Sequence, residues 1–159
     1  MSDVLITRLD HEGEAADFLA LFTEYTRSLG TAGTPSDVPI PANLVEAIQK
    51  RNDVVVFLAY EEKQPAGFAV TVEGFSTFRA MPSLNIHDLG VSSRFRGHGV
   101  GKTLLNAVRD EADKRGCCKL TLEVYENNTR AFSLYQSMGF STLSGNDDTE
   151  QTLFMASPL

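Results

Sequence analysis

The chain has 159 residues, of which 42% are hydrophobic and 22% are charged, proportions that are usual for a folded protein and exclude a disordered chain. Acidic residues outnumber Lys and Arg by 21 to 14, which gives a net charge of −7 at neutral pH. A surface that binds nucleic-acid phosphates is usually basic, so this charge argues against general nucleic-acid binding. Any anionic ligand must be held by a local group of residues, whereas a cationic substrate is compatible with the overall charge.

Neither a membrane span nor an export signal is expected. The longest apolar run, residues 54–60, is far shorter than the roughly 20 residues that cross a bilayer, and residues 1–14 do not resemble a signal peptide. Cys117 and Cys118 are adjacent, and neighbours on a strand point to opposite faces, which disfavours a structural disulfide. Two cysteines do not supply the usual four metal ligands. These features predict a cytoplasmic protein with reduced cysteines and no metal, away from membranes.

The first half of the chain has the pattern of an antiparallel sheet with two helices. Apolar residues recur at helical spacing from Glu14 to about Leu29, whereas the run from 54 to 60 is apolar throughout, as expected of a central strand. The predicted elements are a strand (4–8), a helix (14–29), a Pro/Gly-rich loop (31–41), a helix beginning after Pro41, and two antiparallel strands (54–60 and 67–75).

The second half alternates strands and helices, which predicts a right-handed crossover between parallel strands. Its predicted elements are strands 84–91 and 119–125, helices 99–114 and 129–138, a polar connection (145–150) and a last strand (151–155). Gly116 and Gly139 follow the two helices, where glycine commonly ends a helix in the left-handed conformation. With no repeat or linker, residues 1–159 are expected to form a single α+β (mixed α/β) domain.

A glycine-rich segment between a strand and a helix, residues 94–103, carries the strongest chemical signal. Gly97, Gly99 and Gly101 would let the backbone approach phosphate oxygens, and the N-terminus of the next helix adds unpaired N–H groups and partial positive charge. Three cationic side chains surround the glycines: Arg94, Arg96 and Lys102. We expect this segment to bind a pyrophosphate; the alternative is a turn with solvated basic residues.

Two familiar phosphate-binding motifs do not fit this segment. A Walker A motif requires glycine at position 96, where this chain has arginine. The dinucleotide pattern G-x-G-x-x-G would require glycine at 102 or 104, which are lysine and leucine. The pattern that does fit is R-x-x-G-x-G at Arg96, Gly99 and Gly101.

Two motifs in order make the chain resemble the GNAT superfamily of acetyl-CoA-dependent N-acetyltransferases. The first is Asp88-Leu-Gly-Val91 followed by Arg96-Gly-His-Gly-Val-Gly-Lys102, and the second is Asn128-Thr-Arg-Ala131 followed by Leu134-Tyr135 and Gly139-Phe140. The resemblance covers about residues 84–140. It implies a GNAT-like fold: a mixed, mostly antiparallel sheet of six to seven strands with a splayed parallel pair, flanked by about four helices.

The resemblance also implies where acetyl-CoA, the co-substrate, would bind. The pantetheine arm would enter the gap between the two splayed strands, where a backbone N–H near Leu89 to Val91 would stabilise the oxyanion. Gly90, inside an apolar strand, predicts a β-bulge at that position. The implied cofactor-binding residues are Leu89, Gly90, Val91, Arg94, Arg96, Gly97, His98, Gly99, Val100, Gly101, Lys102, Asn128 and Tyr135.

Tyr135 is the candidate general acid, because a phenol beside the sulfur could protonate the leaving thiolate; burial as an ordinary core aromatic is the alternative. The general base is open, since the glutamate often found before the glycine-rich loop in this family is absent. Regular alternation would put His87 on the same face as Leu89 and Val91, and Asp88 on the other. The candidates are His87, whose ordinary pKa suits the task, then Asp88, Glu123 or water.

The implied enzyme is an N-acyltransferase of the EC 2.3.1 type that passes the acetyl group directly to a primary amine of a small molecule or peptide. The acceptor site would be formed by the first two helices, loop 31–41 and segment 144–150. Acidic residues in these segments could favour a cationic acceptor such as a polyamine or amino acid; the alternative is that some of them are simply solvated loop charges. They are Asp37, Asp147, Asp148 and Glu150. A non-catalytic acyl-CoA sensor or interaction module of the same fold is the alternative. A homodimer is possible, because the family often forms one.

Overall fold

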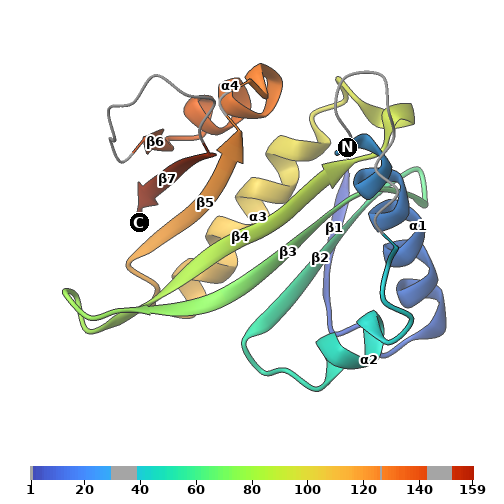
Figure 1. Cartoon of the computed structure of the whole chain (residues 1–159), viewed down its shortest axis with the longest axis horizontal. Helices are drawn as coiled ribbons and strands as arrows, with labels where there is room; N and C mark the ends of the chain where they lie inside the picture. The colour runs from blue at the N-terminus through green and yellow to red at the C-terminus, as the bar shows by residue number, and fades with distance from the viewer. Residues whose placement is uncertain (1, 30–38, 126, 143–151) are drawn as a thin grey trace.

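The computed structural model describes residues 2–29, 39–125, 127–142 and 152–159, and in these ranges seven strands form one sheet covered by four α-helices (Figure 1). The first half contains β1 (Asp3–Thr7), α1 (Glu12–Ser28), α2 (Leu44–Gln49), β2 (Val54–Glu61), β3 (Gln64–Ser76) and β4 (Met81–Val91). The second half contains η1 (Ser93–Phe95), α3 (Val100–Lys114), β5 (Lys119–Tyr125), α4 (Thr129–Ser137), β6 (Ser141–Thr142) and β7 (Thr152–Pro158). The predicted mixed α+β architecture is confirmed.

The strand order is β1-β2-β3-β4-β5-β7-β6, and every neighbouring pair is antiparallel except β4 and β5. The predicted parallel pair is therefore confirmed. β4 and β5 pair only over Leu84–Ile86 and Leu120–Leu122, although both strands continue beyond these residues. The last strand, β7, lies beside β5 of the same chain.

Two apolar layers hold the helices on opposite faces of the sheet. On one face, α3 and α4 pack against buried residues that include Phe57, Leu84 and Ile86. On the other face, α1 and α2 pack against Val56, Leu58, Phe68 and Val70. Because both faces of the central strands are covered, β2 is apolar along nearly its whole length rather than alternating.

A β-bulge at His87 changes the direction of the side chains along β4. Val70 of β3 pairs with Asp88 and Thr71 pairs with Ile86, so His87 is the extra residue. Gly90 pairs regularly with Phe68, so the bulge predicted at Gly90 is wrong. The bulge also interrupts the regular alternation predicted across 85–91, because Leu89 and Val91 pack into the α3 face together with Ile86. The predicted placement of Asp88 opposite Leu89 and Val91 is confirmed, since Asp88 turns to the α1 face and contacts Tyr25.

Gly90 has a packing role in place of the expected bulge. A Cβ atom at this position would come within 2.6 Å of the Phe68 ring and 3.1 Å of the Tyr25 ring. Glycine therefore lets both aromatic rings lie directly against β4, which brings α1 close to the end of the strand.

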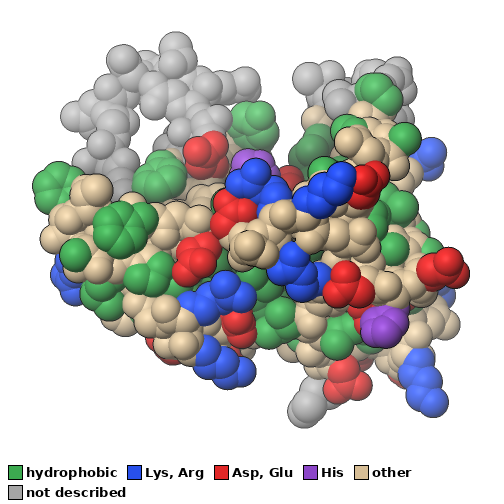
Figure 2. All heavy atoms as spheres, turned by 90° about the horizontal axis from the view of Figure 1, so that it is seen from below, with side chains coloured by type: hydrophobic (Ala, Val, Ile, Leu, Met, Phe, Trp, Pro, Cys, Tyr) green, Lys and Arg blue, Asp and Glu red, His purple; other side chains and the backbone are tan. Residues whose placement is uncertain are grey.

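The outer surface mixes charges of both signs. On the face shown in Figure 2, Lys and Arg side chains are interspersed with Asp and Glu side chains. Phe75 and Phe78, in the hairpin that joins β3 and β4, are 66% and 100% exposed. Among the described helices, none is long and apolar enough to cross a membrane. Most of loop 31–41 and all of the predicted connection 145–150 lie outside the described residues.

Candidate active site

The divergence of β4 from β5 leaves backbone groups of β4 without a strand partner on that side. The Ser92 N–H donates a hydrogen bond to the carbonyl oxygen of Ala66 in β3 at 2.8 Å. Hydrogen-bonding direction alternates along an antiparallel strand, so the N–H groups of Leu89 and Val91 point away from β3. They point into the gap, beyond the last pair that β4 makes with β5 at Ile86 and Leu122. The predicted splayed pair thus exposes two N–H donors at the predicted oxyanion position.

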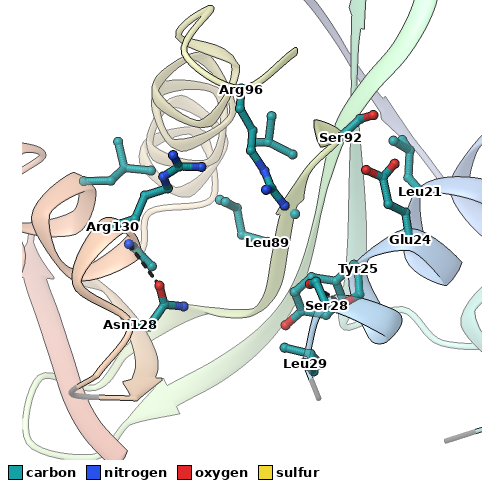
Figure 3. Close-up of a pocket in the computed structure, with 14 residues that line it drawn as sticks. Leu21, Glu24, Tyr25, Ser28, Leu29, Leu89, Ser92, Arg96, Asn128 and Arg130 are labelled. Atoms are coloured by element: carbon teal, nitrogen blue, oxygen red, sulfur yellow. Dashed lines mark hydrogen bonds between the residues drawn. The ribbon is translucent and has the colours of Figure 1, made fainter. Parts of the chain in front are cut away.

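A cavity of about 420 Å³ opens beside this gap. Leu21, Glu24, Tyr25 and Ser28 of α1 form one wall, and residues at the start of α4 face them across the cavity (Figure 3). Leu89 and Arg96 lie between the two walls. The described lining consists of Leu21, Glu24, Tyr25, Ser28, Leu29, Leu89, Gly90, Val91, Ser92, Arg96, Asn128, Arg130, Ala131 and Leu134.

Glu24 ties α1 to the segment that follows β4. Its carboxylate accepts a hydrogen bond from the Ser93 N–H at 2.7 Å. Burial acts to raise the pKa of Glu24, but the hydrogen bonds from Ser93 and Ser92 and the charge of Arg96 outweigh burial and lower it. Glu24 is therefore ionised at neutral pH and fixes the position of the loop from which Arg96 enters the cavity.

A second cavity of about 430 Å³ lies over the glycine-rich loop and the start of α3. Gly97 and Gly99 have φ values of +81° and +82°, in the left-handed region that favours glycine. The first hydrogen bond of the helix runs from Thr103 N–H to Gly99 O, so the N–H groups of residues 100–102 precede it and remain available to an anion. The described lining is Val91, Phe95, Arg96, Gly97, Gly99, Val100, Gly101, Lys102, Arg130, Leu134 and Ser137.

The two cavities share four lining residues: Val91, Arg96, Arg130 and Leu134. An elongated ligand could therefore place an anionic end at the start of α3 and continue along the gap beside β4. Free N–H groups, a helix N-terminus and two arginines suit a pyrophosphate, and the apolar walls suit a narrow uncharged arm. The donor set thus fits coenzyme A. Among the described residues, no group of three or more His, Cys, Asp or Glu could hold a metal ion.

Asp88 is hydrogen-bonded to a tyrosine of α1 and acts electrostatically on a tyrosine of α4. The Tyr25 hydroxyl of α1 donates a hydrogen bond to Asp88 Oδ1 at 3.2 Å. Burial raises the pKa of Asp88 above its usual value, although the electrostatic effect of His87 and the hydrogen bond from Tyr25 oppose this. A carboxylate with a raised pKa is a stronger base than an exposed one, which suits proton transfer near neutral pH.

Tyr135 is the second tyrosine near Asp88. It is buried, and its ring centroid lies 5.8 Å from that of Phe140. Arg109 of α3 fixes the end of α4 by donating to Met138 O at 2.8 Å and to Ser157 Oγ at 2.9 Å. Burial first, and then the charge of Asp88, raise the pKa of Tyr135 to about 12. With this raised pKa, the Tyr135 hydroxyl is protonated at neutral pH. Among the described residues, none makes a hydrogen bond with it, so it is available as a donor.

The structure brings together most of the predicted cofactor-binding residues, with some exceptions. Those that line one cavity or both are residues 89–91, Arg96, Gly97, residues 99–102 and Asn128. Arg94 lies over the Phe95 ring at 5.5 Å, His98 is exposed, and neither they nor Tyr135 are among the lining residues. Asn128 Oδ1 also caps α4 by accepting the Ala131 N–H at 3.3 Å.

The candidate bases differ in their surroundings. His87 is exposed at the bulge, and Glu123 is exposed on β5. Asp88 is half-buried beside Tyr25, which lines the first cavity. The acidic loop residues 37, 147, 148 and 150 lie outside the described residues.

Sequence reasoning missed three residues of the site. The helical spacing of residues 14–29 indicates only that Tyr25 lies on an apolar helix face, and no motif gives Glu24 a role. Arg130 belongs to the motif that begins at Asn128, and the structure shows that it lines both cavities. The available signal was its position in the first turn of the predicted helix 129–138, two residues after Asn128.

Comparison with known proteins agrees with this geometry. A family model described as "Acetyltransferase (GNAT) family" matches residues 18–140. The chain is 29% identical over 132 residues to the uncharacterized N-acetyltransferase YhfO of Bacillus subtilis, covering 83% of this chain and 87% of that protein. It is 32% identical over 101 residues to the [ribosomal protein bS18]-alanine N-acetyltransferase of Escherichia coli, covering 59% of this chain and 64% of that protein.

Solved structures share the fold. The ribosomal-protein-alanine N-acetyltransferase from Brucella melitensis superposes with a TM-score of 0.73 at 24% identity, covering 98% of this chain and 99% of that chain. The family match spans both the glycine-rich loop and the Asn128–Phe140 motif. The chain therefore belongs to the GNAT family of acetyltransferases.

Proposed function

We propose that this protein transfers an acetyl group from acetyl-CoA directly to a primary amine of a small molecule or peptide. The observation that carries the proposal is the gap between β4 and β5, which is continuous with the glycine-rich loop at one end and close to Asp88 at the other. Acetyl-CoA supplies the activated acyl group as a thioester. The N–H groups of residues 100–102, with Arg96 and Arg130, would hold its phosphates.

The proposed reaction needs one base for the acceptor's proton and one hydrogen-bond donor for the leaving sulfur. Asp88 accepts a proton from the acceptor ammonium, and the freed amine forms a C–N bond with the thioester carbonyl carbon. The N–H groups of Leu89 and Val91 hydrogen-bond the oxygen on which negative charge develops. As the C–S bond breaks, Tyr135 hydrogen-bonds the leaving sulfur, which ends as a thiol, and one proton is released to solvent overall. Each step uses residues of this chain and requires no covalent enzyme intermediate.

The test is release of free thiol from acetyl-CoA in the presence of three amines: a peptide with an N-terminal alanine, L-lysine and spermidine. Acetylation of at least one, confirmed by mass spectrometry of the product, supports the proposal. The alternative, a non-catalytic acyl-CoA-binding module, predicts tight acetyl-CoA binding with no turnover for any of these amines.

Arg96 lines both cavities. Replacing it by alanine should weaken acetyl-CoA binding about tenfold, because the charged hydrogen bond that it would make to a phosphate is lost. Isothermal titration calorimetry at low and high salt measures the change, which should shrink as salt screens the phosphate charge. Arg79→Ala, which removes an exposed positive charge from the β3–β4 hairpin, is the matched control. Equal affinity for wild type and Arg96→Ala would contradict the assignment of the phosphate site.

A further inference from the structure

We propose that Tyr25 is a positioning residue that holds the Asp88 carboxylate at the acceptor side of the gap, with Oδ2 free to take the acceptor's proton. The inference rests on the proposed function and adds α1 to the machinery that handles the acceptor amine. Sequence motifs gave Tyr25 no chemical role, and it lies 63 positions from Asp88 in the chain.

The ring of Tyr25 is fixed by aromatic packing. Its centroid lies 5.3 Å from that of Phe68 in an edge-to-face arrangement and 6.0 Å from that of Phe22. The absence of a side chain at Gly90 makes room for the ring, as a Cβ there would lie 3.1 Å from Tyr25 Cδ2. A phenol held in this way presents its hydroxyl at a defined point above β4.

The bulge at His87 orients the Asp88 side chain toward Tyr25. Without it, the Asp88 side chain would point toward the α3 face, away from Tyr25. With it, Asp88 Oδ1 lies 3.2 Å from the Tyr25 hydroxyl. Among the described residues, none donates a hydrogen bond to Asp88 Oδ2, so this oxygen is available to an ammonium group or a bridging water.

The charged and titratable groups that face this pair come from three other positions. Asp88 acts electrostatically on Tyr135 of α4, Tyr135 and Tyr125 of β5 act on Tyr25, and His87 precedes Asp88 on β4. His87 favours the ionised form of Asp88, as does the hydrogen bond from Tyr25, whereas burial disfavours it. Removal of the Tyr25 hydroxyl therefore has a defined sign: the pKa of Asp88 should rise further.

The experiment uses Tyr25→Phe, which keeps the ring against Phe68 and removes only the hydroxyl. Tyr60→Phe is the matched control, because the Tyr60 hydroxyl also donates to a carboxylate, that of Asp17 on α1, at 2.9 Å. Tyr60 lines neither of the two cavities. The Asp88 carboxyl carbon is followed by ¹³C NMR as pH is varied in the whole chain, and the signal is assigned by its loss in Asp88→Asn.

We expect Tyr25→Phe to move the Asp88 titration to higher pH, and Tyr60→Phe to leave it unchanged. With an amine that the wild type acetylates, the acidic limb of kcat/KM should move upward in parallel, and kcat should fall about tenfold with little change in the KM for acetyl-CoA. A lower melting temperature alone would not produce this shift.

The positioning role of Tyr25 and the proposed acetyltransferase function are contradicted by different results. An unchanged Asp88 titration in Tyr25→Phe would overturn the positioning role, whatever the activity. A shifted titration with an unshifted acidic limb would show that Asp88 does not take the acceptor's proton, and would also overturn it. Tight acetyl-CoA binding without turnover of any tested amine by the wild type would overturn the proposed function, and the catalytic role of the pair with it.

Discussion

Replacing Asp88 by asparagine is expected to lower kcat by about 10²–10⁴-fold with whichever amine the wild type acetylates, because it removes the proposed base. The side chain keeps its size and can still accept the hydrogen bond from Tyr25, so the KM for acetyl-CoA should change little. Steady-state kinetics with acetyl-CoA and amine varied in turn separate the two parameters. Asp110→Asn, on the exposed side of α3, controls for the loss of one negative charge.

Two further variants distinguish Asp88 from its rivals. His87→Gln and Glu123→Gln remove the other candidate bases, both of which are exposed. We expect each to retain kcat within a few-fold of wild type, apart from a small shift of the acidic limb in His87→Gln, since His87 favours the ionised form of Asp88. A larger loss of kcat in either variant than in Asp88→Asn would transfer the role of base to that residue.

The stability of Asp88→Asn should move in the opposite direction to its activity. Burial raises the pKa of Asp88 in the folded protein, so ionising this group costs more in the folded state than in the unfolded state. Its contribution to stability is therefore complete below the unfolded pKa and is lost as pH rises through the folded pKa. Relative to wild type, Asp88→Asn should gain stability at neutral pH and lose that advantage in acid, as urea unfolding at several pH values would measure.

The predicted elements agree with the structure wherever the local pattern determines them. Strand 119–125 and helix 129–138 match β5 and α4 to within a residue, because an apolar run and helical spacing are bounded by Gly116 and Gly139. Both glycines have positive φ, at +70° and +89°. The glycine-rich loop was likewise identifiable, because its left-handed turns require glycine itself.

The arrangement of the proposed base could not be predicted in the same way. Residues 85–91 read as one regular strand, and nothing in that segment marks His87 as the extra residue. The bulge depends on how β4 pairs with β3, and that register involves the close contact of Gly90 with Phe68, which is distant in sequence. The role of Tyr25 could not be predicted for the same reason. Helical spacing indicates that its ring packs on the sheet, but the residue that accepts its hydrogen bond, Asp88, lies on a strand distant in sequence. Strand β6, with two residues, is too short to give a pattern.

Tyr135→Phe is expected to lower kcat by about 10²-fold while leaving acetyl-CoA affinity near wild type, because the ring and its packing on Phe140 are retained. The hydroxyl, with a pKa of about 12, is a weaker acid than an ordinary thiol, whose pKa is about 8.5. In the proposed reaction, Tyr135 would therefore stabilise the developing thiolate by hydrogen bonding rather than by releasing its proton. Tyr60→Phe is again the control, and retention of kcat within twofold in Tyr135→Phe would place the donor elsewhere.

The electrostatic effect of Asp88 on Tyr135 would link the two halves of the proposed reaction. The charge of Asp88 is one of the two causes that raise the pKa of Tyr135. If the carboxylate takes the acceptor's proton as proposed, that charge is gone and the phenol would become a better acid as the thiolate begins to leave. The variants Asp88→Asn, Tyr135→Phe and their combination test this coupling, since residues that act together lose activity non-additively. The double variant should retain more activity than the product of the two single losses, whereas strictly multiplicative losses would mean that the two groups act independently.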